Sequence, residues 1–163
     1  MKDLPERQLN PKVKNVWRIN DAVWITACAL CFVITALIME SDPEVAVVGG
    51  IMMTVTLVVY VVMMVIWLVV LPPIRFYRWR YEVSEEYLDI AKGIVWRKRI
   101  VIPFIRVQNT DTRQGPILRL FGLASVTVDT AAGGHEIPGL DLETAEALRD
   151  KAAELARLAR EDV

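Results

Sequence analysis

The residues whose types could do chemistry are concentrated between Ile105 and Thr130. This stretch, IRVQNTDTRQGPILRLFGLASVTVDT, is rich in the arginine, amide, carboxylate and threonine side chains that line active sites. Catalysis also needs an acid–base group, a nucleophile or a metal held beside such side chains. The stretch has no Ser–His pair, no metal-ligand spacing and no glycine loop that could hold a phosphate. Its polarity therefore needs a different explanation.

Other reactive residue types are present but are not arranged for catalysis. His135 is the single histidine and is expected in a glycine turn, where it would be solvated. Asp111 and Asp129 are expected on adjacent strands, without a histidine or lysine near either in the sequence. Cys28 and Cys31 have the C-x-x-C spacing, yet they lie in the middle of an apolar helix rather than at a helix start in water. We predict no catalytic residue, metal, cofactor or small-molecule substrate, and no enzymatic activity.

Two apolar runs dominate the first half of the chain. Ala22 to Met39 is 18 residues without a charge, and Val45 to Leu71 is 27. As helices they would span roughly 27 and 40 Å, against about 30 Å of hydrocarbon. We predict two transmembrane helices joined by the short loop ESDPE as a tight hairpin. The alternative for the first run, a cleaved signal peptide, is disfavoured because no small-residue cleavage site precedes Glu40 and a second span follows.

The basic residues orient this hairpin. The connecting loop has no Lys or Arg, whereas the flanks carry several, among them Arg75, Arg78 and Arg80. The positive-inside rule then places both termini in the cytoplasm. Residues 81–163 hold 11 Lys and Arg against 14 Asp and Glu, which gives no attraction for nucleic acid.

The periodicity changes from helix to strand at about Arg78. Six short strands are expected, and Pro103 predicts that the third is an edge strand or contains a bulge. Pro116 and Gly122 bound a short helix expected to form an apolar plug, and a turn is expected at Gly133–Gly134. The strands are RYEVS, YLDIAKG, VWRKRIVIPFI, RVQNTDT, LASVTVDTA and HEIPGL, and DLETAEALRDKAAELARLAR is an amphipathic C-terminal helix.

This order of elements predicts a bent antiparallel sheet or open barrel capped by the C-terminal helix, as in pleckstrin-homology (PH) domains. The complete prediction is a cytoplasmic β domain attached to a membrane α-helical hairpin. Its parts are a cytoplasmic N-terminal segment (1–21), transmembrane helices (22–39 and 45–71), an extracytoplasmic loop (40–44), a basic and aromatic juxtamembrane segment (72–80) and the PH-like domain (81–163).

Three segments resemble one known family. They are IPFIRVQNTDTRQGPILRLFGLASVTVDTAAGG (Ile102 to Gly134), its approach RYEVSEEYLDIAKGIVWRKR, and NPKVKNVWRI before the first helix. Together they resemble the bacterial PH domains of the YdbS/YdbT-like membrane proteins, and the YdbS-like members in particular, over nearly the whole chain. Ala132, where a glycine would also fit, is a trivial departure from the pattern.

The resemblance implies a multi-pass protein of the bacterial cytoplasmic membrane that acts without catalysis in the cell envelope. It also implies pairing with a larger membrane protein that carries several PH domains. The resemblance further implies a role in envelope stress or in resistance to membrane-active peptides. No catalytic residues are attached to it.

The polar stretch has several open explanations. Beyond Val107 neither face of its first strand is apolar, although a strand in a small barrel normally buries one face. It is an edge strand extending past the core, or its side chains bond loop backbone, or it is a docking edge for a second copy or a PH-domain partner. In the docking interpretation the contact residues are Arg106, Gln108, Arg113 and Gln114.

An alternative function is a sensor of anionic lipid headgroups. The turn Ser84-Glu85-Glu86, where eukaryotic PH domains usually bind phosphoinositides, would repel a phosphate. The candidate lipid contacts are instead basic clusters, each cation being worth roughly 1 kcal/mol near an anionic surface. They are Arg75, Arg78, Arg80, Arg97, Lys98 and Arg99.

Small residues four apart suggest close helix packing in the membrane. Gly50 and Thr54 have this spacing on the second helix, and Ala27 and Cys31 on the first. They either pack the hairpin against itself or contact another copy.

Overall fold

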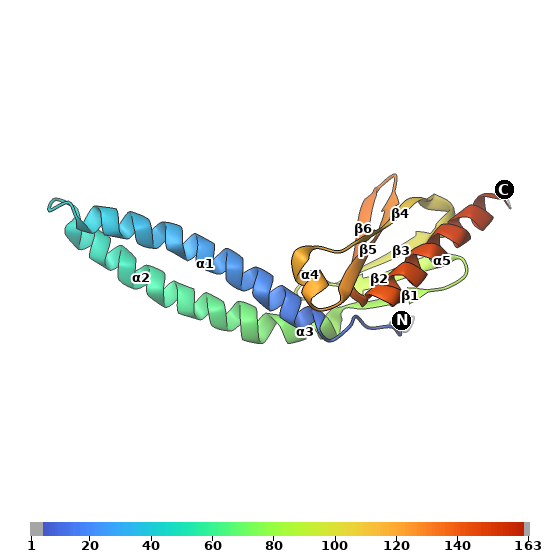
Figure 1. Ribbon diagram of the computed structural model, residues 1–163, viewed down its shortest axis with the longest axis horizontal. Coiled ribbons are helices and arrows are strands. Elements are labelled where there is room, and N and C mark those ends of the chain that lie inside the picture. The colour runs from blue at the N-terminus through green and yellow to red at the C-terminus, as the bar shows by residue number, and fades with distance from the viewer. Residues whose placement is uncertain (1–4, 162–163) are drawn as a thin grey trace. The chain divides into compact units, whose positions relative to one another are not determined.

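The computed structural model describes residues 5–161 and divides them into two compact units (Figure 1). One unit is the helical hairpin, residues 17–73. The other contains residues 74–161 together with 5–16. The β domain therefore includes an N-terminal segment that the sequence-based boundary at residue 81 left out.

The hairpin is built from α1 (Val13–Glu40) and α2 (Ala46–Val65). The second helix continues through a π-helical turn, η1 (Ile66–Val70), into α3 (Leu71–Arg78). Within the described residues two helices, 13–40 and 46–78, are long and apolar enough to cross a membrane. Only 6% and 0% of their most apolar windows are buried, which is the opposite of a core helix in a soluble protein.

The two helices approach each other at Gly49, one residue away from the predicted contact. A Cβ atom at Gly49 would lie 2.6 Å from the amide nitrogen of Glu40 and 2.9 Å from the carbonyl oxygen of Ala36. Ala36 is fully buried. Gly49 is thus the small residue that permits close approach within the hairpin.

The small residues expected to pack the hairpin against itself do not do so. A Cβ at Gly50 would meet nothing within 4 Å, and the Thr54 hydroxyl donates to the Gly50 carbonyl of its own helix at 3.0 Å. Ala27 and Cys31 are exposed on α1. Spacing identified a small-residue pair but not the face on which the helices meet. Contact with another copy stays a prediction.

Two prolines directly after the π-helical turn leave the Leu68 carbonyl without a helical donor. Residues four and five positions after Leu68 are Pro72 and Pro73, which have no N–H, so neither an α-helical nor a π-helical bond can reach the Leu68 oxygen. The Arg18 side chain of α1 fills this gap, because its Nε donates to that oxygen at 2.8 Å. A basic residue thereby ties the start of the first helix to the end of the second.

The β domain holds two three-stranded antiparallel sheets, and the described strands do not close into a barrel. The first sheet is β1 (Arg80–Val83), β2 (Tyr87–Lys92) and β3 (Lys98–Pro103). The second is β4 (Val107–Arg113), β5 (Leu123–Thr130) and β6 (Gly133–Asp141), each sheet in chain order. The 3₁₀ turn η2 (Phe104–Arg106) joins the sheets, and α4 (Pro116–Leu120) precedes β5.

The C-terminal helix α5 (Leu142–Glu161) packs against β4, β5 and η2. Its buried stripe contains Ala145, Leu148, Ala152 and Ala156. The 3,4 spacing of apolar residues in the sequence predicts the first three, but it continues to Leu155 and Ala159, which are only half-buried. The rest of the core comes from both sheets and the corner between them, with Leu88, Ile90, Phe104, Leu123, Val126 and Ile137 almost completely buried.

Three details of the predicted β domain were wrong. The third strand begins at Lys98, not Val95, because Gly93 starts a tight loop. The last turn lies at Ala131–Ala132, where the Thr130 hydroxyl accepts from the Ala132 N–H at 3.2 Å, so Gly133, Gly134 and His135 belong to β6. The α4 segment is no plug, because none of its residues is buried and Leu120 is 81% exposed. Pro103 does lie on an edge strand, as expected.

The N-terminal segment bonds both sheets. Arg7 and Tyr81 of β1 exchange backbone hydrogen bonds of 3.1 and 3.0 Å, and the Asn10 N–H donates to the Gly139 carbonyl of β6 at 3.0 Å. Leu9 and Val13 are buried. Burial also raises the pKa of the Tyr81 hydroxyl, against the opposing effect of nearby Arg7. The segment acts as a strap across the domain.

Candidate functional site

The polar strand β4 lies at the edge of its sheet. The order β4-β5-β6 leaves one side of β4 without a strand partner in the described chain. Its pairing with β5 steps from Val107–Thr130 to Asn109–Asp129, so Gln108 is a bulged residue. From Asn109 to Arg113 the pairing is regular. The edge-strand explanation of its polarity agrees with this position.

A groove of about 390 Å³ runs beside this edge, between β4 and α5. Its walls mix apolar and polar groups. Arg157 and Glu161 form an ion pair on its helical side, with 2.9 Å between Nη1 and Oε1. The lining residues are Val107, Gln108, Asn109, Thr110, Ala153, Ala156, Arg157 and Glu161.

The four predicted docking residues lie at different places along this edge. Arg106 is in η2 rather than on the strand, and Arg113 is the last residue of β4. Both are exposed, as is Gln108 at the bulge. Gln114 is exposed as well, and its side chain donates from Nε2 to the Leu123 carbonyl at 3.0 Å, which is the loop-backbone role left open above. All four residues are thus exposed, and the Gln114 side chain also supports the fold.

The three residues of the predicted basic cluster, Arg97, Lys98 and Arg99, have different roles in the structure. The Arg99 guanidinium binds the carboxylate of Asp89, with Nη2 at 2.6 Å from Oδ2 and Nε at 3.1 Å from Oδ1. Asp89 is 2% exposed, and the hydrogen bond from Arg99 raises the pKa of the arginine. Arg99 therefore neutralises a buried charge, whereas Arg97 and Lys98 have no ion-pair partner within residues 5–161.

We expect Arg99→Met to destabilise the domain, because it leaves the Asp89 carboxylate buried without its cation. Arg97→Met, two residues earlier on an exposed loop, is the matched control and should have little effect. Thermal unfolding of the full chain in detergent, followed by tryptophan fluorescence, measures the difference. Equal melting temperatures for the two variants would mean that Asp89 does not depend on Arg99.

The juxtamembrane arginines occupy the helix end and the first strand. Arg75 and Arg78 lie on the last turn of α3 and are exposed, and Arg80 begins β1 and is half-buried. The positive charges suit the negative end of that helix. Their proposed contact with lipid stays a prediction.

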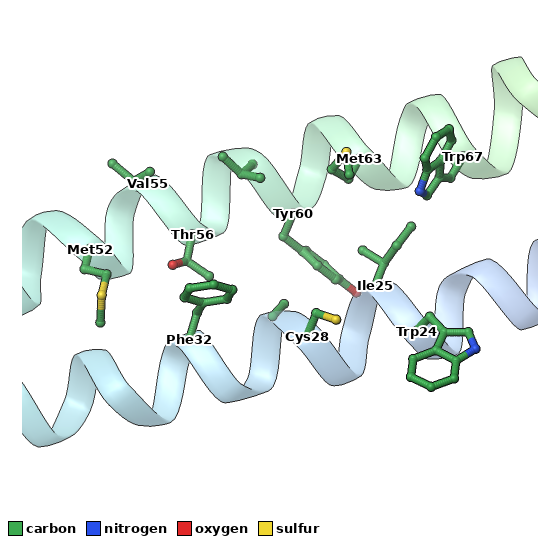
Figure 2. Close-up of a pocket in the computed structure, with 12 residues that line it drawn as sticks. Trp24, Ile25, Cys28, Phe32, Met52, Val55, Thr56, Tyr60, Met63 and Trp67 are labelled. Atoms are coloured by element: carbon green, nitrogen blue, oxygen red, sulfur yellow. The ribbon is translucent and has the colours of Figure 1, made fainter.

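The hairpin carries an apolar groove of about 550 Å³ (Figure 2). Tyr60 reaches across it from α2 toward α1, where its hydroxyl lies 3.3 Å from that of Thr26. Phe32 points from α1 toward α2 near Thr56. Cys28 lines this groove among apolar side chains, as expected of a small apolar residue. In residues 5–161 no three His, Cys, Asp or Glu side chains are grouped to hold a metal.

Comparison with known proteins agrees with these features. A family model described as bacterial PH domain matches residues 22–156. The chain is 36% identical over 163 residues, covering both proteins completely, to the UPF0699 transmembrane protein YdbS of Bacillus subtilis (strain 168). It is 28% identical over 89 residues to the UPF0699 transmembrane protein YdbT of the same organism, covering 52% of this chain and 18% of YdbT.

No solved structure matches the chain. The family model nevertheless spans most of it, and the match to YdbS runs over its full length. Two long apolar helices precede two antiparallel sheets and a C-terminal helix, which is the PH-like architecture that the motifs indicated. The chain belongs to the bacterial PH domain family, as a membrane protein of the YdbS/YdbT type.

Proposed function

We propose that this protein is a non-catalytic interaction module. Its hairpin anchors a PH-like domain at the cytoplasmic face of the membrane, where the domain assembles with a second copy or with a larger PH-domain membrane protein. The observation that supports this proposal best is the position of β4 as the end strand of its sheet, with its regular segment from Asn109 to Arg113 near the groove with α5.

The geometry of β4 suits the addition of a partner strand. Its residues from Asn109 to Arg113 keep regular pairing on one side, so their outward N–H and C=O groups alternate as a strand partner requires. The bulge at Gln108 ends the regular segment, and such bulges limit uncontrolled edge-to-edge pairing. Arg106 and Arg113 flank this short edge, and an acidic partner segment would complement them.

YdbT supports a partner of the same family. It is a longer protein than this chain, and one part of it resembles this chain over 89 residues. A larger membrane protein with a similar domain would present a related surface beside this one. The suggested role in envelope stress or in resistance to membrane-active peptides belongs to the same proposal.

The cytoplasmic orientation is also part of the proposal. Residues 5–16 and 74–161 belong to one compact unit, so both ends of the hairpin must lie on the same side of the membrane. An even number of crossings fulfils this condition. The Lys and Arg residues of both flanks and their absence from the 40–44 loop favour the cytoplasm.

The test is a pull-down of the tagged full-length chain from native membranes in mild detergent. We expect a second membrane protein or a second copy to co-purify in fixed proportion. The double variant Arg106→Glu, Arg113→Glu should weaken the association by about tenfold, which corresponds to about 1.4 kcal/mol.

Arg119→Glu, an exposed charge reversal on α4, is the matched control and should leave the association intact. Membrane insertion should be the same for all three proteins. A monomer that co-purifies with lipid alone, or a partner retained fully by the double variant, would rule out the β4 edge as the docking site.

A further inference from the structure

The loop between β2 and β3 presents two large apolar side chains to solvent. Val95 is 83% exposed and Trp96 is 87% exposed, at the apex of residues 93–97. Burial of a tryptophan is among the most favourable apolar contributions that a side chain can make. Because Val95 and Trp96 are exposed, they contribute almost no burial to the stability of the domain. Their side chains are available to contact a surface outside it.

The backbone of this loop is closed tightly. Gly93 has φ +113°, and a Cβ atom there would overlap the carbonyl oxygen of Trp96. The chain therefore turns back on itself directly beneath the apex, where no side chain could fit. Val95 and Trp96 are held outward by this closure, and little ordering would be required for them to bind.

Cations surround the base of the loop. Lys92 and Lys98 are direct partners across the β2–β3 hairpin, an arrangement of like charges that destabilises a sheet unless an anion lies nearby. Arg97 is exposed beside them, and no acidic residue lies between positions 92 and 98. None of the three cations has an ion-pair partner within residues 5–161. The Lys92 ammonium lies 5.7 Å from the centre of the Trp79 ring.

The pKa of His135 on β6 is affected by these cations. Burial lowers the pKa of His135 first, and Lys92 and Lys98 lower it further, with Asp129 opposing them. Both ammonium groups therefore act on the same neighbourhood. Asp89, the buried carboxylate on β2, is already bound by Arg99 and does not compensate them.

We propose that residues 92–98 form a membrane-contact loop, in which Val95 and Trp96 enter the interfacial layer of an anionic bilayer while Lys92, Arg97 and Lys98 bind lipid phosphates. Tryptophan is enriched at this layer because its ring is apolar and its N–H is polar. The cations complement anionic headgroups. This site is distinct from the β1–β2 turn, which carries Glu85 and Glu86.

A bilayer is favoured over a protein partner because of how the domain is anchored. The hairpin, residues 17–73, is bordered directly by residues 16 and 74 of the β domain. No linker separates them in the sequence, so the domain stays at high effective concentration beside the lipid surface. Weak contacts from a small loop suffice under these conditions.

The test uses the full-length protein in vesicles. In a Cys28→Ala, Cys31→Ala background, Val95→Cys carries an environment-sensitive dye, and Glu85→Cys on the β1–β2 turn carries the same dye as control. The vesicles contain phosphatidylcholine alone or with phosphatidylglycerol. Brominated lipids quench a dye in the bilayer, and iodide quenches a dye in water.

With phosphatidylglycerol present, we expect several-fold stronger quenching by brominated lipid at position 95 than at position 85, together with protection from iodide. Trp96→Ser should weaken this effect, and so should the triple change Lys92→Gln, Arg97→Gln, Lys98→Gln. Raised salt should do the same for the unaltered loop. Far-UV circular dichroism checks that each variant is folded.

Three outcomes would overturn the proposal. Equal quenching at positions 85 and 95 would mean that the loop has no special contact. Equal quenching with and without phosphatidylglycerol would remove the headgroup role of the cations. Protection from iodide without quenching by brominated lipid would mean that protein, not lipid, covers Val95 and Trp96.

Discussion

Gly139→Ala is expected to destabilise the β domain by about 2–5 kcal/mol. Gly139 has φ +64°, a conformation that costs a residue with a Cβ roughly 1–2 kcal/mol. That Cβ would also overlap the side chain of Val13, which is completely buried, and overpacking of this kind costs about 1–3 kcal/mol. Denaturant unfolding of the full chain in detergent, followed by tryptophan fluorescence, measures the loss.

Gly122→Ala is the matched control for this variant. Gly122 has φ +67°, but a Cβ there would meet nothing within 4 Å, so the control contains the backbone cost without the overlap. Adding Val13→Ala to Gly139→Ala should recover part of the difference in a double-mutant cycle. If the two glycine variants unfold alike, the N-terminal strap is not packed on β6.

Phe104→Ala is expected to cost about 3–5 kcal/mol, the usual range for a phenylalanine removed from a core. Phe104 is completely buried in η2, at the corner where β3 of one sheet passes into β4 of the other. Its N–H donates to the Glu86 carbonyl at 3.0 Å, which fixes the corner to the β1–β2 turn. The same unfolding measurement applies, because Trp79 is buried in this domain.

Ile105→Ala tests whether this cost is specific to the buried side of the corner. Ile105 is the next residue of the same turn but is 46% exposed, so its loss should be well below that of Phe104→Ala. Because Arg106 follows in the turn, Phe104→Ala should also weaken partner capture at temperatures where the variant is still folded. A cost for Phe104→Ala as small as that for Ile105→Ala would contradict a packed corner between the sheets.

The elements that sequence predicted correctly are those whose signal is local. The two long charge-free runs predicted two long apolar helices, and the structure has them at residues 13–40 and 46–78 with almost nothing covering their most apolar windows. The 3,4 spacing from Ala145 to Ala152 identified the buried face of α5, because helical geometry alone decides which residues share a face. Pro103 indicated an edge strand through its missing N–H.

The features that the sequence did not predict depend on which atoms meet in three dimensions. Gly49 and Gly50 are equivalent by composition, and only the position of Ala36 and Glu40 on the other helix distinguishes them. Val95 and Trp96 have high β-propensity and were assigned to a strand, but the tight closure at Gly93 places them in a loop.

The candidate site was predicted in part for the same reason. The polarity of β4 indicated an edge, but Gln114 could not be separated from its neighbours without the Leu123 carbonyl to which it donates. Arg99 and Arg97 are likewise equivalent in the sequence, and only the ion pair of Arg99 with Asp89, ten residues earlier, distinguishes them. Side chains of one type differ in role only through distant partners.

The strap of residues 5–16 makes the β domain discontinuous, with the membrane hairpin as an insertion within it. Leu9 and Val13 are synthesised before β1 and β6, yet their places in the core exist only after those strands have been made. Completion of the domain therefore follows synthesis of the whole hairpin that lies between them in the sequence. A fragment that begins at residue 81 would lack this strap and expose the surfaces that it covers, so a soluble version must rejoin residue 16 to residue 74 by a short linker.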